Sequence, residues 1–205
     1  AYHAMAKVGD DVVLFGGEGT EGFFNDTWIW ISNEAQWNKT SHHQAETSPK
    51  SRVAHSMARV NYTHVFLFGG NSPNMLTLSD AWYFSLKGGW KKYANIHSTV
   101  SPPARARHAM AYIGGGEMLL FGGRSRNEQE NTILGDTWIL NATSGLWKDL
   151  STELTTFGTV PSARYGHSMA FGGEGMALLF GGVARADTQQ SPWSSLRDSY
   201  VFFNR

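Results

Sequence analysis

The chain has 205 residues, of which 41% are apolar and 13% aromatic, and this is enough for one domain with a substantial hydrophobic core. Its 17 Lys and Arg balance its 17 Asp and Glu, which argues against a broadly basic surface for nucleic acid or for an anionic membrane. The sequence contains no cysteine, which excludes disulfides, thiolate metal sites and cysteine nucleophiles. No apolar run approaches the ~20 residues of a membrane span, so we expect no membrane insertion.

Four copies of one pattern fill the sequence, and each copy opens with a His-x-Met-Ala segment followed by an apolar run that ends in Leu-Phe-Gly-Gly. The segments start at His3, His55, His108 and His167, and the glycine pairs stand at 16–17, 69–70, 122–123 and 181–182. A run that is apolar at nearly every position predicts a strand buried on both faces. The paired glycines predict positive φ where this strand turns outward. We therefore expect two paired strands, a and b, in every copy.

A third and a fourth strand, c and d, follow in the first three copies. Strand c begins with an Asp-x-aromatic motif, and strand d carries a further tryptophan. The motifs are Asp26/Trp28, Asp80/Trp82, Asp136/Trp138 and Asp198/Tyr200, and the later tryptophans are Trp37, Trp90 and Trp147. The last copy stops within strand c, so we expect it to lack strand d. No segment keeps a 3.6-residue period over ten residues, which predicts that helix is nearly absent.

Units of four short strands that recur every ~50 residues are typical of β-propeller blades. The residues quoted above resemble the kelch repeat, in its longer variant with Pro-x-x-Arg-x-x-His before strand a. The resemblance covers essentially the whole chain and implies an all-β, kelch-type propeller domain. We expect four blades, the last one incomplete, at about 1–48, 49–101, 102–160 and 161–205. Because kelch propellers commonly have more blades, we expect a fragment of a larger ring, with a closed four-bladed ring as the alternative.

Residues that recur in every copy are expected to serve the blade itself. We interpret the four histidines as hydrogen-bonded scaffold residues. Two interpretations stay open for Arg52, Arg105 and Arg164, which precede strand a. Each guanidinium could hold carbonyls of the adjacent blade. By the family resemblance, these arginines could instead contact an acidic peptide.

Specificity is expected where the copies differ, in the long b–c and d–a connections. Antiparallel alternation places both kinds of connection at the same end of the blades, which is typical of a binding face. The candidate partner-binding residues on this face are Phe23, Phe24, Arg124, Arg126, Trp193 and Arg197. The arginines of this face, together with Arg185, alternate with Glu128, Glu130 and Asp187, and this mixed charge favours a protein or peptide partner over phosphate chains. Trp193 is either a local packing residue or an anchor for the partner.

These observations predict a non-catalytic module that binds a protein segment or peptide on its long-loop face. Two alternatives are a sugar-binding or sugar-isomerising propeller with its ligand in the central channel, and homotypic assembly through open blade edges. The match Gly17-x-Gly19-x-x-Gly22 is followed by a strand, whereas the dinucleotide fingerprint requires a helix. His42 and His43 with Glu46 occur in one crossing only. We expect no catalytic residue, cofactor or metal.

The cellular compartment is left open by the sequence. The chain opens without a visible signal peptide, and we expect either a cytoplasmic or a secreted protein, with the cytoplasm slightly favoured. The sequons at Asn61 and Asn141 lie on the face opposite the long loops, so a secreted protein carrying glycans there would keep its binding face free.

Overall fold

The computed structural model describes residues 1–40, 48–94, 100–127, 131–154, 160–185 and 193–203. Strands dominate these residues, and the single helix among them is α1 (Ser151–Leu154), so the prediction of an all-β chain is confirmed. Close contacts divide the chain into two compact units, which we describe separately. Unit 1 comprises residues 1–94 and 104–106, and unit 2 comprises residues 95–103 and 107–205.

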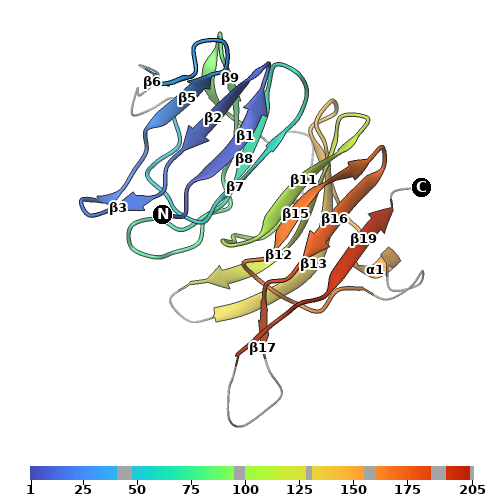
Figure 1. Ribbon diagram of the computed structural model, residues 1–205. Coiled ribbons are helices and arrows are strands. Elements are labelled where there is room, and N and C mark those ends of the chain that lie inside the picture. The colour runs from blue at the N-terminus through green and yellow to red at the C-terminus, as the bar shows by residue number, and fades with distance from the viewer. Residues whose placement is uncertain (41–47, 95–99, 128–130, 155–159, 186–192, 204–205) are drawn as a thin grey trace. The chain divides into compact units, whose positions relative to one another are not determined.

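In unit 1, the described residues form two four-stranded antiparallel sheets, which we call blades 1 and 2 (Figure 1). Blade 1 has the strand order β1 (Ala4–Val8), β2 (Asp11–Phe15), β5 (Thr27–Ile31) and β6 (Gln36–Lys39). Blade 2 has the order β7 (Ser56–Arg59), β8 (Val65–Phe68), β9 (Ala81–Ser85) and β10 (Gly89–Lys92). These are the expected strands a to d of the first two copies.

Unit 2 contains blades 3 and 4. Blade 3 has the order β11 (Ala109–Gly114), β12 (Glu117–Arg126), β13 (Asn131–Asn141) and β14 (Leu146–Asp149). Blade 4 has three strands among the described residues, in the order β15 (Ser168–Gly173), β16 (Met176–Phe180) and β19 (Ser199–Phe203), as predicted for the incomplete copy. Each sheet lies inside one of the four expected blade ranges. The exact residues at which one blade ends and the next begins stay a prediction.

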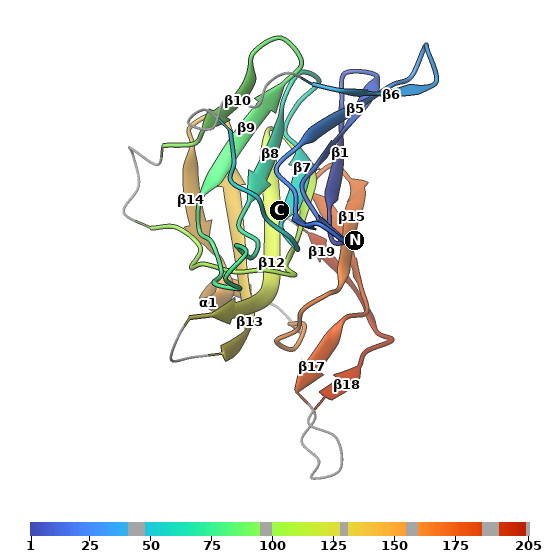
Figure 2. The ribbon, with the colours of Figure 1, turned by 90° about the vertical axis from the view of Figure 1, so that its left-hand side faces the viewer.

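The b–c connections contain more strand than expected. In blade 1 they form the small hairpin β3 (Glu18–Gly19) and β4 (Gly22–Phe23), and in blade 4 the hairpin β17 (Val183–Arg185) and β18 (Trp193–Ser195). Figure 2 shows this second hairpin projecting beyond the three strands of blade 4. In blade 3, residues 124–135 were expected to form a loop. This prediction is wrong at both ends of the range, because β12 and β13 pair as far as Arg126 and Asn131. The β-branched residues Thr132 and Ile133 favour this extended ladder.

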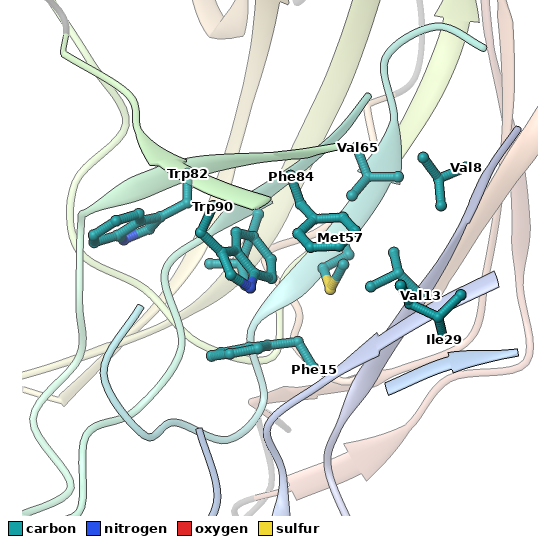
Figure 3. Close-up of a cluster of buried hydrophobic side chains, with 10 residues drawn as sticks. Val8, Val13, Phe15, Ile29, Met57, Val65, Trp82, Phe84 and Trp90 are labelled. Carbon is teal, nitrogen blue, oxygen red and sulfur yellow. The ribbon is translucent and has the colours of Figure 1, made fainter. Parts of the chain in front are cut away.

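The core of unit 1 lies between the two sheets that it contains (Figure 3). Blade 1 contributes alternate residues of its inner strands, and blade 2 contributes larger side chains, two of them tryptophans. The buried residues are Val8, Val13, Phe15, Ile29, Met57, Val65, Leu67, Trp82, Phe84 and Trp90. The Trp90 ring packs edge-on against Phe15 at 4.9 Å, and its indole N–H donates to the Thr27 hydroxyl at 2.9 Å. The tryptophan of strand d thus joins two blades.

The core of unit 2 repeats this arrangement between blades 3 and 4. Its buried residues are Ala111, Ile113, Leu119, Ile139, Leu150 and Ala177, with Met169 and Phe202 packed against them. Strand b is buried on both faces in β8, as predicted. The same prediction is wrong for β16, where Phe180 is 61% exposed, because one face of blade 4 is open to solvent.

The glycine pairs have the predicted conformation. The second glycine of each pair has φ between +98° and +104°, at Gly17, Gly70, Gly123 and Gly182. A Cβ at Gly70 would lie 2.8 Å from the Val53 carbonyl oxygen and 2.8 Å from the His55 Cβ. Both a positive φ and a close backbone approach therefore require glycine here.

We expect Gly70→Ala to lower the free energy of unfolding by about 3 kcal/mol, because it combines an unfavourable φ with a backbone clash. Gly22→Ala is the matched control, since Gly22 has φ +113° but nothing within 4 Å of its would-be Cβ. Gly22→Ala should lower the free energy of unfolding only by the ~1–2 kcal/mol that a positive φ costs a residue with a Cβ. Chemical denaturation of both variants measures the difference. Equal costs would show that sterics at Gly70 are unimportant.

Candidate functional site

The arginine before strand a of blade 2 is buried and held by an aspartate and by two backbone carbonyls of the same blade. We call this arrangement the arginine clamp. The Arg52 side chain is fully buried, and its Nη1 and Nη2 donate to the two carboxylate oxygens of Asp80, each at 2.7 Å. Nη1 also donates to the Gly69 carbonyl at 2.9 Å, and Nε donates to the Lys50 carbonyl at 3.1 Å. This bidentate pairing uses the fork geometry that only arginine offers.

The Asp-x-Trp motif completes this clamp. Burial acts to raise the pKa of Asp80, but the hydrogen bonds and charge of Arg52 outweigh it and hold that pKa below its usual value. The Trp82 indole donates to the same carboxylate at 2.8 Å. The equivalent indoles of Trp28 and Trp138 donate to the aspartate two residues earlier, at 2.9 Å and 2.6 Å. The aspartate and the tryptophan of the motif therefore stabilise each other.

The clamp recurs in blade 4. Arg164 is fully buried and pairs with both carboxylate oxygens of Asp198, at 2.6 Å and 2.8 Å, and with the Gly181 carbonyl at 3.0 Å. Hydrogen bonds from Arg164 lower the pKa of Asp198. Arg105 is also fully buried.

The backbones of Arg52, Arg105 and Arg164 are hydrogen-bonded to the blade that precedes their own. The Gly17 and Gly70 amides donate to the Arg52 and Arg105 carbonyls, both at 2.9 Å, and the Gly123 amide donates to the Arg164 carbonyl at 2.8 Å. For Arg52 and Arg164, the side chain then enters the following blade. The expected contact with adjacent-blade carbonyls is thus corrected: the backbone joins the previous blade, and the side chain holds the carboxylate and the Gly-Gly turn of its own. Since their guanidinium groups are buried, Arg52, Arg105 and Arg164 are left out of the partner surface proposed below.

The histidines of the repeat are buried and packed against aromatic rings. His55 lies edge-on to Phe15 at 5.6 Å, and His167 lies edge-on to Phe121 at 5.5 Å. The ring nitrogens of these two histidines form no hydrogen bond of ordinary geometry among the described residues, but the backbone of Phe15 and of Phe121 lies close enough to raise the pKa of His55 and His167 as a hydrogen-bond partner would. Burial, reinforced by the charge of the nearby clamp arginine, outweighs this effect and lowers the pKa of His55 to about 3 and that of His167 to about 4. Both are neutral core residues at pH 7.

Unit 2 presents a cluster of cations and aromatic rings, which we call the Arg–aromatic cluster: Arg107, Arg124, Tyr165 and Trp193. The guanidinium carbons of Arg107 and Arg124 lie 5.8 Å and 5.7 Å from the centre of the Tyr165 ring. Arg124 also lies 5.8 Å from the Trp193 ring, and the two rings meet edge-on at 6.0 Å. Trp193 is 42% exposed, so the cluster faces solvent. These contacts are typical cation–π distances.

Three separate segments hold the cluster in place. Trp193 begins β18 and pairs with Arg185 across the hairpin. Tyr165 is tied to the base of this hairpin by two backbone hydrogen bonds with Val183, at 3.0 Å and 2.9 Å. Arg124 lies in the β12–β13 ladder, where its Nε donates to the Asn131 side chain. The cluster is therefore built on strands.

The structure brings together only some of the predicted partner-binding residues. Arg124 lies beside the Trp193 ring, so Trp193 packs locally, and with 42% of Trp193 exposed its role as an anchor for a partner stays a prediction. Arg126, at the end of β12, and Arg197, before β19, are exposed. Phe23 and Phe24 lie in unit 1. Phe23 is half-buried, and Phe24 is 38% exposed. The residues outside the described ones are His42, His43, Glu46, Glu128, Glu130 and Asp187.

Sequence reasoning missed Arg107 and Tyr165. Both occupy variable positions inside the Arg-x-x-His motif, whereas the sequence prediction used only the residues that recur in this motif. Arg107 has φ +56°, as do Tyr2 and Ala54 within a degree at the same position before the histidine, and Gly166 has φ +67° there. Because all four copies share this positive φ, the conformation belongs to the blade, and Arg107 is distinguished only as a bulky cation where such a φ costs free energy. A comparison of the non-repeating residues within the motif could have found it.

Two absences hold within the described part of the chain. No group of three or more His, Asp or Glu side chains there is arranged to hold a metal ion. No helix among those residues is long and apolar enough to cross a membrane. The sequons at Asn61 and Asn141 have a local explanation, since each side-chain oxygen accepts two backbone amides of its own turn.

Repeated antiparallel sheets joined by the arginine backbone and by the d-strand tryptophan define a β-propeller made of blades. The family model for the KLHDC2/KLHL20/DRC7 Kelch-repeats domain matches residues 2–202. The chain therefore belongs to the kelch-repeat family, which confirms the resemblance drawn from the motifs. Kelch domains are generally protein-interaction modules.

Several curated proteins are similar to this chain. Adagio-like protein 1 of Oryza sativa subsp. japonica is 29% identical over 204 residues, which cover 97% of this chain and 30% of that protein. An F-box/kelch-repeat protein of Arabidopsis thaliana is 31% identical over 198 residues, covering 89% of this chain and 38% of that protein. Kelch domain-containing protein 2 of Bos taurus is 34% identical over 128 residues, covering 62% and 30%. The chain spans about a third of the length of these relatives.

Proposed function

We propose that this chain is a non-catalytic protein-interaction module that binds an acidic protein segment through its Arg–aromatic cluster. The observation that carries the proposal is the cation–π placement of Arg107 and Arg124 over the Tyr165 ring, beside the exposed Trp193. A guanidinium group held beside aromatic rings has several N–H donors in a planar fork, and this fork matches the geometry of a carboxylate. Tyr, Trp and Arg are also the residue types that dominate binding energy at protein interfaces.

The charge around the cluster supports an acidic partner. The described residues of the connections near it include the exposed cations Arg126, Arg185 and Arg197. The carboxylate of Asp198, in the same region, is already paired with the buried Arg164. The same connections also carry Glu128, Glu130 and Asp187, which lie outside the described residues, so the proposal rests on the arginines of the described part. Local complementarity of this kind steers association and selects partners.

Labelled random dodecapeptides test this proposal by fluorescence anisotropy. One set carries four Asp or Glu residues at fixed positions, and the matched set carries Asn or Gln there. We expect saturable binding of the acidic set only, weakening as ionic strength rises from ~0.05 to ~0.5 M because the charges become screened. Trp193→Ala should weaken this binding and leave the thermal midpoint nearly unchanged. Equal affinity for both peptide sets would refute the acidic partner.

Arg107→Gly separates binding from stability. Glycine tolerates φ +56°, so we expect the free energy of unfolding to stay constant or rise by about 0.5 kcal/mol. Loss of the guanidinium should weaken acidic-peptide binding about tenfold, which corresponds to ~1.4 kcal/mol.

Ala54→Gly is the matched control, because Ala54 has the same φ at the same repeat position in unit 1 and carries no charge. Its stability should change by the same amount and its binding should not change. A drop in affinity for both variants would assign the effect to the backbone and remove Arg107 from the site.

A further inference from the structure

One face of blade 4 is apolar and open to solvent. On this face Leu178 is 48%, Phe180 61%, Val201 48% and Phe203 59% exposed. Leu178 pairs with Val201 across β16 and β19, so these side chains alternate with Ala177 and Phe202, which pack into the core of unit 2. Only one of the two apolar faces of this sheet is therefore covered. We call the open one the blade-4 face.

Blade 1 also has an open apolar face, on the side of the sheet away from the core of unit 1. Its members lie in two rows across the strands: Met5, Leu14 and Trp28, then Val12, Trp30 and Trp37. Met5 is 50% exposed and Trp37 is 41% exposed. The Trp30 and Trp37 rings meet edge-on at 5.7 Å, which leaves a broad aromatic surface. We call this the blade-1 face.

The internal repeat shows that these two faces are complementary. In the core of unit 1, the side of blade 1 that carries Val13, Phe15 and Ile29 packs on a tryptophan-rich side of blade 2. The repeat equivalents of those three residues in blade 4 are Leu178, Phe180 and Val201, on the blade-4 face. The tryptophan-rich side of blade 2 carries Met57, Val65, Leu67, Trp82, Phe84 and Trp90. Their equivalents in blade 1 are Met5, Val12, Leu14, Trp28, Trp30 and Trp37, on the blade-1 face.

Unit 2 contains the same interface a second time. Leu119 and Ile139 of blade 3, which are equivalent to Val13 and Ile29, share a core with Met169, Ala177 and Phe202 of blade 4. The chain therefore builds one kind of blade-to-blade interface twice and exposes one half of it on blade 1 and the other half on blade 4. Apolar faces of this kind mark interaction sites.

We propose that the blade-4 face of one copy of this chain docks on the blade-1 face of a second copy. A second copy fits this face because the docked pair reproduces the interface present within each unit. The contact joins two different faces, so it is heterologous and either closes into a ring or continues into a longer array. This inference is independent of the acidic partner, which binds elsewhere on unit 2.

Light scattering across a dilution series from ~1 to ~100 µM tests the association. We expect the wild-type chain to show a concentration-dependent mass above that of the monomer. Phe180→Glu and Met5→Glu each introduce a charge at a position at least half exposed within its unit, so folding should be retained. Burying that charge in an apolar contact should weaken association about 100-fold. Phe171→Glu is the control, because Phe171 is 51% exposed on the opposite side of blade 4 and should leave association unchanged.

Mixing the two variants identifies the pairing. Each variant alone should be monomeric, whereas an equimolar mixture should form a one-to-one dimer, since Phe180→Glu retains an intact blade-1 face and Met5→Glu an intact blade-4 face. A wild-type monomer throughout the dilution series would overturn the proposal. So would a mixture that stays monomeric, or association that survives in either variant alone, because both would contradict the pairing of unlike faces.

Discussion

Replacing Arg52 with alanine is expected to lower the free energy of unfolding by about 3 kcal/mol, because it breaks a buried ion pair and leaves one partner without compensation. The side chain is fully buried and donates four hydrogen bonds, two of them to Asp80. Asp80 retains 27% side-chain exposure, so water can partly solvate the orphaned carboxylate, which places the expected loss at the lower end of the range for buried pairs. Urea denaturation at pH 7 measures it.

The first repeat offers a matched control for this variant. The aspartate of its Asp-x-Trp motif, Asp26, pairs with Lys39 at 3.3 Å, and the lysine side chain is 53% exposed. Lys39→Met should cost less than ~1 kcal/mol, because exposed pairs contribute little. If Arg52 instead served a partner, Arg52→Ala would leave stability almost unchanged and abolish acidic-peptide binding. That result would contradict the assignment of this arginine to the scaffold.

The repeat explains why the fold could be predicted from the sequence alone. The positive φ of Gly70 recurs in all four copies and the tryptophan of strand d recurs in the first three, so their spacing reveals the strand order. The extension of β12 and β13 could not be predicted, because it occurs in one copy only and depends on a ladder between segments with turn-like composition. A feature that occurs in one copy only cannot be recognised by comparing the four copies with one another.

The candidate site was only partly predictable for a related reason. Trp193 stood out as an aromatic residue in a polar connection, and Arg124 as one of several cations. Arg107 and Tyr165 lie 17 residues or more from both in the sequence, and they join the cluster through the backbone bonds between Tyr165 and Val183. The Asp80 partner of Arg52 was not predicted, because the two residues are 28 positions apart in the sequence and meet only when β8 and β9 pair beside the Gly69 turn.

Acid should destabilise both units well before their carboxylates titrate, and the buried histidines are the reason. In the folded chain the pKa of His55 is about 3 and that of His167 about 4, both below the ordinary value of 6.5. Below pH 6.5 the unfolded chain therefore binds protons that the folded chain does not. The stability present above pH 6.5 is lost progressively as the pH falls towards 4 and 3. At pH 4 the expected loss is about 3 kcal/mol for each histidine.

The loss of stability that comes from protonating the histidines can be distinguished from the loss that comes from protonating the carboxylates. The lowered pKa of Asp80 also makes stability fall in acid, but only below the ordinary aspartate value of 3.8. Denaturation midpoints at pH 7, 6, 5 and 4 should therefore fall with a shallower slope in His55→Gln than in the wild type, although this variant is less stable at pH 7. His64→Gln is the control, since His64 is exposed and its replacement should leave the slope unchanged. Identical slopes in His55→Gln and the wild type would mean that His55 is charged in the fold, which its burial against Phe15 and beside the Arg52 guanidinium argues against.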